Sequence, residues 1–212
     1  MPRVVFGAAR GVLACSRAME KARALFDVLL SAEEARDVGP FLGAVATAVD
    51  GGWAVDSAVD DEGMTLLHHV CSRRSAFGEA DERQAVTRLL DLSASASLVD
   101  QDGTNALMFA AMAGNAPSAA VLLSKGAEVD AVNGFGESAL ILAAACGECA
   151  VIETLITHGA NLTLKATSGE HEGRNALVTA RACMRMQAAK VIDSHDPVQR
   201  ARREAQEQRR QA

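Results

Sequence analysis

The sequence predicts an all-α solenoid, in which helix-turn-helix units joined by β-hairpin-type loops stack in a row. The stretch from Gly103, GTNALMFAAMAGN, returns 33 residues later from Gly136 as GESALILAAACGE. Gly126-Ala127 returns at the same interval as Gly159-Ala160. With 49% apolar and 23% charged residues, the chain can bury a sizeable core. Self-similarity at a fixed period of this size is the signature of a repeat architecture.

Composition narrows the classes of protein that remain. No apolar run reaches the roughly 18 residues that span a bilayer, so we expect no membrane span. The odd count of 5 cysteines, without a secretory signal, argues against a disulfide framework and for a cytoplasmic protein. An organellar location is the alternative, because Arg3, Arg10 and Arg17 precede the first acidic residue, Glu20.

The elements are expected in three segments. Residues 1–50 form an N-terminal helical cap, with one helix over Ser16–Leu30 and a second over Ala32–Val49. Residues 51–193 form the array, with about four repeats that start near 60, 100, 133 and 170. Residues 194–212 form a polar, Arg-rich C-terminal helix or tail.

Two of the four repeats are out of step by small insertions. The copies that begin at Gly63 (GMTLLHHVC) and at Gly173 (GRNALVTARAC) lie 40 and 37 residues from their neighbours. The first insertion falls around residues 72–84, between two helices of one repeat. The second lengthens the hairpin over residues 165–173 into a finger, and inserted loops of this kind often carry function.

Small and apolar residues explain why the units stack. Ala110-Ala111 and Ala143-Ala144 let neighbouring helices approach closely, and leucine pairs give each unit an apolar stripe that it cannot bury alone. Gly126 and Gly159 suit the left-handed residue that ends a helix. Pro117 suits the first turn of a second helix, where its missing N–H is not needed.

These residues resemble the ankyrin family, whose units read Gly-x-Thr-Pro-Leu-His-x-Ala-Ala and end their second helix in Leu-Leu-x-x-Gly-Ala. Thr65, Leu67 and His68 match most closely, whereas Leu66 replaces the family's proline. The resemblance covers roughly residues 50–193. It implies a non-enzymatic protein-protein interaction module, such as an adaptor, scaffold or assembly subunit. We expect no cofactor, metal or small-molecule substrate.

The resemblance also implies where a partner binds: on the concave surface made by the hairpin tips and the outward faces of the first helices. Acidic residues gather at these tips, Asp60 and Asp100 among them, so we expect a partner with a basic segment. Plain solubility is the alternative reading of the charge. The predicted partner-binding residues are Asp61, Glu62, Met64, Arg73, Gln101, Asp102, Thr104, Met112, Phe135, Glu137, Cys146, His171, Glu172 and Arg174.

Aromatic residues make up only 3% of the chain, so their positions are informative. Phe135 lies at a hairpin tip between two glycines, where it serves either as a binding anchor or as packing against a neighbouring tip. Trp53 occupies the place of the buried alanine in a Gly-Ala pair. Phe109 lies on an inner helix face, so both of these are expected to pack in the interior.

Three features of the sequence offer alternatives to a binding module. Cys146 and Cys149 form a C-x-x-C pair that could be redox-active, although both replace small packing residues of the other repeat. His68 and its neighbours His69 and Cys71 look like a metal cluster, but the resemblance implies that His68 bridges backbone groups of neighbouring hairpins.

The third feature is the Arg-rich tail, which could bind nucleic acid or an anionic membrane. Its charge is diluted by Glu204 and Glu207, and no aromatic residue is interleaved for base stacking, so nucleic-acid binding is not the favoured prediction. The basic residues concerned are Arg200, Arg202, Arg203, Arg209 and Arg210.

Overall fold

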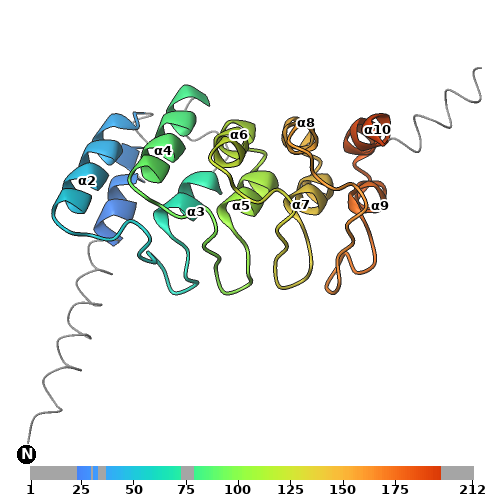
Figure 1. The fold of residues 1–212 in the computed structure, drawn as a ribbon, viewed down its shortest axis with the longest axis horizontal. Helices are drawn as coiled ribbons and strands as arrows, with labels where there is room; N and C mark the ends of the chain where they lie inside the picture. Colours follow the sequence, from blue (N-terminus) through green and yellow to red (C-terminus); the bar gives the residue numbers. More distant parts are fainter. Residues whose placement is uncertain (1–22, 30, 33–36, 73–78, 197–212) are drawn as a thin grey trace, which may run out of the picture.

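The computed structural model describes residues 23–29, 31–32, 37–72 and 79–196. Helices pair into a row of units, and the loops that join the units project from one side of the row (Figure 1). The predicted all-α solenoid is confirmed: within the described residues, extended pairing is limited to isolated bridges. The helices are α2 (Gly39–Asp50), α3 (Leu66–Cys71), α4 (Glu79–Asp91), α5 (Ala106–Ala113), α6 (Ala116–Ser124), α7 (Ala139–Cys146), α8 (Cys149–Thr157), α9 (Ala176–Ala182) and α10 (Met186–His195).

Four units follow one another along the row. Unit 1 is α3 with α4, unit 2 is α5 with α6, unit 3 is α7 with α8, and unit 4 is α9 with α10. The first helices of neighbouring units pack against each other (Figure 1). Each unit follows a hairpin closed by a bridge, and we number these hairpins 1 to 4: Ala58 with Thr65, Val99 with Asn105, Val132 with Ser138, and Ala166 with Glu172.

In units 2, 3 and 4 the first helix begins after a residue whose side chain caps it. The side chain of Asn105 accepts a hydrogen bond from the backbone N–H of Met108 at 3.0 Å, and Ser138 and Asn175 cap α7 and α9 in the same way. A cap of this kind satisfies an N–H group that has no partner within the helix. Pro117 lies in the first turn of α6, as predicted.

The core runs along the whole row, between the first and second helices. Ala110, Ala111, Ala143 and Ala144 are completely buried, as predicted for positions where helices approach closely. Leucines of α6 and α8 fill the space beside them. Each unit therefore buries its apolar surface mainly against its neighbours. The units at the two ends of the row have a neighbour on one side only, so their outer sides need other cover. None of the described helices is long and apolar enough to cross a membrane.

The N-terminal cap differs from the sequence-based prediction. A single helix over Ala32–Val49 was expected, but residues 37 and 38 are not helical and α2 begins at Gly39. The reason is local. Pro40 occupies the first turn of α2, and the carboxylate of Asp37 accepts a hydrogen bond from the N–H of Gly39 at 2.9 Å. Of the helix predicted over Ser16–Leu30, residues 23–29 are helical, and residues 16–22 and 30 lie outside the described part.

At the other end, α10 extends to His195, so residues 194 and 195 are part of unit 4 rather than of the polar tail. The Arg-rich stretch itself, residues 197–212, lies outside the described residues. The insertion near residue 72 falls between α3 and α4, as expected.

The turn between the two helices of a unit needs a left-handed residue. Gly114 and Gly147 provide it in units 2 and 3, with φ of 73° and 87°. In unit 4 the same position is Met184, with φ of 60° and an exposed side chain. A side chain in this conformation costs about 1–2 kcal/mol. Unit 4 therefore carries strain that units 2 and 3 avoid.

Replacing Met184 with glycine should raise the free energy of unfolding by about 0.5–1 kcal/mol, because relief of strain outweighs the extra freedom of glycine in the unfolded chain. Thermal denaturation followed by circular dichroism measures the change. Ser93, whose φ is 70°, offers a second test of the same argument, and Ser93→Gly should stabilise by a similar amount. A lower melting temperature for Met184→Gly would contradict the strain argument.

Candidate protein-binding surface

Hairpins 1, 2 and 3 have tips of the same construction. In each, one Asp or Asn side chain accepts hydrogen bonds from two backbone N–H groups of the tip. In hairpin 2, Asp100 Oδ1 accepts hydrogen bonds from the backbone N–H groups of Asp102 (2.9 Å) and Thr104 (2.8 Å). Asp60 does the same in hairpin 1, and Asn133 in hairpin 3. The carboxylates of Asp60 and Asp100 therefore hold the conformation of their own tips. The acidic surface that a partner can reach is smaller than the sequence predicts.

Backbone hydrogen bonds tie each tip to the next. The N–H of Gln101 donates to the carbonyl of Glu62 at 3.1 Å, and the N–H of Gly134 donates to the carbonyl of Asp102 at 2.8 Å. A Cβ atom at position 134 would lie 2.9 Å from that carbonyl oxygen, so the approach requires glycine. The tips form one continuous edge along the row (Figure 1).

The structure brings most of the predicted partner-binding residues to this edge. The exposed ones are Asp61, Glu62, Gln101, Asp102, Phe135 and Glu172. Met112, Cys146 and Arg174 are half-buried, and Arg73 lies outside the described residues.

The other four predicted residues, Met64, Thr104, Glu137 and His171, are buried, so their side chains offer little exposed surface. Met64 and Thr104 directly follow the turn glycines of their tips, and the next hairpin lies over those glycines. A Cβ atom on Gly103, for example, would lie 2.9 Å from the backbone nitrogen of Gly134. Glu137 and His171 are buried for a different reason, because they pair with each other.

The pair joins hairpin 3 to hairpin 4. Nδ1 of His171 lies 2.6 Å from Oε1 of Glu137, and the two side chains are 11% and 10% exposed. The other carboxylate oxygen accepts a hydrogen bond from the amide of Asn133 at 3.0 Å. In addition, the N–H groups of Thr167 and Ser168 both donate to the carbonyl of Phe135. The predicted finger over residues 165–173 is therefore fastened to hairpin 3 and does not project freely.

Phe135 is partly packed and partly open, and its predicted role as a binding anchor stays a prediction. A Cβ atom on Gly169 would lie 3.3 Å from Cδ1 of Phe135, so the finger covers part of the ring. The residue nevertheless stays 41% exposed. A large apolar side chain that is held on one side and open on the other suits an anchor for a partner.

Residues predicted to be structural are confirmed as such. Nδ1 of His68 accepts a hydrogen bond from the N–H of Thr65, and its Nε2 donates to the carbonyl of Leu98, each at 3.0 Å. Burial lowers the pKa of His68, which keeps the ring neutral for this bridge. The ring of Phe109 packs against it with centroids 5.5 Å apart. Trp53 is buried, with 5% of its surface exposed.

Three of the described cysteines, Cys71, Cys146 and Cys149, belong to the predicted redox pair or to the apparent metal cluster. Cys146 ends α7 and Cys149 begins α8, on either side of the turn at Gly147. The Cys149 thiol donates to the carbonyl of Gly147 at 3.6 Å, within its own turn. Cys71 is buried, which raises its thiol pKa. Across the described part of the chain, no group of three or more His, Cys, Asp or Glu residues is arranged to hold a metal ion.

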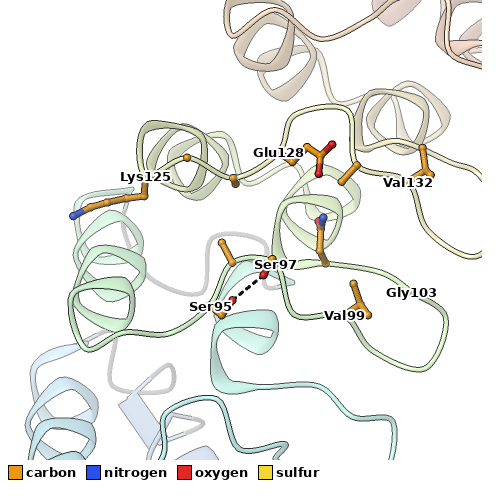
Figure 2. Close-up of a pocket in the computed structure, with 12 residues that line it drawn as sticks. Ser95, Ser97, Val99, Gly103, Lys125, Glu128 and Val132 are labelled. Carbon is orange, nitrogen blue, oxygen red and sulfur yellow. Dashed lines mark hydrogen bonds between the residues drawn. The ribbon is translucent and has the colours of Figure 1, made fainter.

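Sequence reasoning missed two exposed valines. Val99 and Val132 occupy the same position of hairpins 2 and 3, each directly before the residue that holds the tip, and each is 50% exposed. They line a groove of about 450 Å³ that also includes Lys125 and Glu128 (Figure 2). The sequence carried a signal for them, since an apolar residue stands beside the turn at the same position of two repeats.

The comparison with known families agrees with the geometry. The sequence model of the family described as ankyrin repeats (3 copies) matches residues 44–133 and 76–166. The two ranges overlap and together cover more than half of the chain. No curated protein sequence matches this chain.

Proposed function

Since the chain belongs to the ankyrin-repeat family, whose repeats are generally protein-protein interaction modules, we propose that it binds a partner protein along its hairpin edge. The partner presents a basic segment to this edge. The chain then acts as a non-enzymatic adaptor, scaffold or assembly subunit. We call the exposed part of the surface the binding edge; it consists of Asp61, Glu62, Gln101, Asp102, Phe135, Glu170 and Glu172.

The placement of Phe135 among exposed carboxylates carries this proposal. Asp102 precedes it along the edge, and Glu170 and Glu172 follow in the finger that covers one side of the ring. Within the described residues, the carboxylates of the binding edge form a single ion pair, between Asp61 and Arg23 at 3.6 Å. The remaining negative charge is available to a partner.

Charge and anchor do different work in such a surface. Exposed carboxylates attract and orient a basic segment over a distance of about a Debye length, roughly 8 Å at physiological salt. A half-exposed aromatic side chain supplies contact area that is lost from water on binding. Association should therefore slow as salt rises, whereas the lifetime of the complex depends mainly on Phe135.

The double variant Phe135→Ala/Asp102→Lys should weaken partner binding at least tenfold, because it removes the anchor and reverses a neighbouring charge. Affinity capture with the wild-type chain identifies the partner, and surface plasmon resonance with the purified partner measures the loss. Glu153→Lys, an equal charge reversal at an exposed position of α8, is the matched control and should leave affinity within about twofold. Unchanged affinity in the double variant would rule out this surface.

A further inference from the structure

Unit 4 ends the described row, and the side of α9 that faces away from α7 is exposed. Val178 marks this side. The residues at its position in units 2 and 3 are Met108 and Ile141, and both are only 1% exposed. Val178 is 47% exposed, because no further unit follows it in the described chain.

One turn along α9, Arg181 takes a position that alanine holds elsewhere. Ala111 and Ala144, the corresponding residues of units 2 and 3, are completely buried. The Arg181 side chain is 58% exposed, although it lies 3.7 Å from the carboxylate of Asp193. A further ankyrin unit would need a small residue here. Arg181 thus excludes ordinary repeat stacking and adds a positive charge to the uncovered side.

The third position on this side is Met184, at the turn. Its counterpart in unit 3, Gly147, is covered by the next unit, since a Cβ atom there would lie 2.8 Å from Cδ of Arg185. Met184 is 75% exposed and holds a left-handed conformation that the other units give to glycine. A terminal repeat normally presents a polar outer face. Unit 4 instead presents valine and methionine beside Arg181.

We propose that Val178, Arg181 and Met184, which we call the end face, dock an amphipathic helix of a partner protein. This helix carries aliphatic side chains flanked by carboxylates. The aliphatic groups contact Val178 and Met184, whose flexible thioether adapts to irregular surfaces. A carboxylate pairs with Arg181, whose guanidinium can bind it through two hydrogen bonds.

Charge selects this occupant over two others. The chain's own residues 197–212 carry five arginines against two glutamates, so this segment would bring a net like charge to Arg181. A second copy related by a two-fold axis would bring the Arg181 side chains of both copies into one small interface. An acidic helix meets neither obstacle. The end face is separate from the binding edge, and this inference does not depend on the proposed function.

Site-specific photo-cross-linking of the full chain, in cells of its source, tests the proposal. A benzophenone amino acid replaces Met186, which is 50% exposed and lies near Met184, in a hollow that Cys146 and Gly147 of unit 3 also line. The expected product is a cross-link to another protein, at a segment with aliphatic residues at helical spacing and neighbouring Asp or Glu. Arg181→Ala and Met184→Gly should each lower the yield at least fivefold.

Both variants install residues that units 2 and 3 already use, so folding is not at risk, and melting temperatures verify this. Ser93→Gly, which changes a left-handed residue far from the end face, should leave the yield unchanged. The proposal would be overturned if no cross-link formed, or if the cross-links were confined to residues 197–212 or to a second copy of the chain. A yield that falls in Phe135→Ala but not in Arg181→Ala would also overturn it, because the partner would then be held by the binding edge alone.

Discussion

A chain with alanine in place of His68 is expected to lose about 3–4 kcal/mol of unfolding free energy. The side chain is completely buried, so its removal leaves a cavity. It also leaves two polar groups without partners: the N–H of Thr65, which donates to Nδ1, and the carbonyl of Leu98, which accepts from Nε2. Because Leu98 lies just before hairpin 2, the same ring connects unit 1 to the next hairpin.

Urea denaturation followed by circular dichroism measures this loss. His158→Ala is the control, since His158 is exposed at the end of α8 and its ring bonds to the Thr154 carbonyl of the same helix. That substitution should change stability by less than about 0.5 kcal/mol. A loss for His68→Ala as small as that of the control would show that the bridge contributes nothing.

His68 should also make stability depend on pH. Burial lowers its pKa from 6.5, so the unfolded chain binds a proton more readily than the folded chain. Its contribution is complete above the unfolded pKa and is lost as pH falls below it. Protonation also removes the lone pair of Nδ1 that accepts from Thr65. The stability difference between wild type and His68→Ala should therefore shrink as pH falls from about 7.5 to about 5.5. A difference that grows over this range would contradict a neutral ring that accepts at Nδ1 and donates at Nε2.

The repeat made most of the array predictable from the sequence. The 33-residue interval places Gly114 and Gly147 at equivalent turns, and caps such as Asn105 and Ser138 follow from ordinary helix chemistry. Prediction failed where no repeat guides it. In the N-terminal cap, hydrophobic spacing suggested one helix over Ala32–Val49, but Pro40 fixes the start of α2 at Gly39.

Exposure at the binding edge was harder to predict than its location. A tip residue is open or buried according to how the next hairpin lies over it, and that depends on contacts between residues about one repeat apart. Glu137 and His171, separated by 34 residues, show this clearly. Each looks like a charged tip residue when taken alone, and only their pairing across two hairpins buries both.

Removing one member of that pair should destabilise the chain by about 2–3 kcal/mol, somewhat less than for a fully buried ion pair, because some solvent reaches it. In His171→Ala the Glu137 carboxylate keeps Asn133 but loses its 2.6 Å partner. Urea denaturation measures the effect, with the exposed His195→Ala as control. In a double-mutant cycle, Glu137→Gln combined with His171→Ala should cost less than the two single losses together, with a coupling of about 1–2 kcal/mol. Additive losses would mean that the two side chains act independently.

The same substitution should loosen the finger locally before the array unfolds. The amides of Thr167 and Ser168 donate to the carbonyl of Phe135 beside the pair, so hydrogen exchange at these two amides should quicken in His171→Ala while α5 and α7 stay protected. Release of the finger uncovers the side of the Phe135 ring that faces Gly169. The pair therefore links stability to the binding edge: if the ring is an anchor held in place by the finger, partner affinity should fall in His171→Ala although every residue of the binding edge is still present.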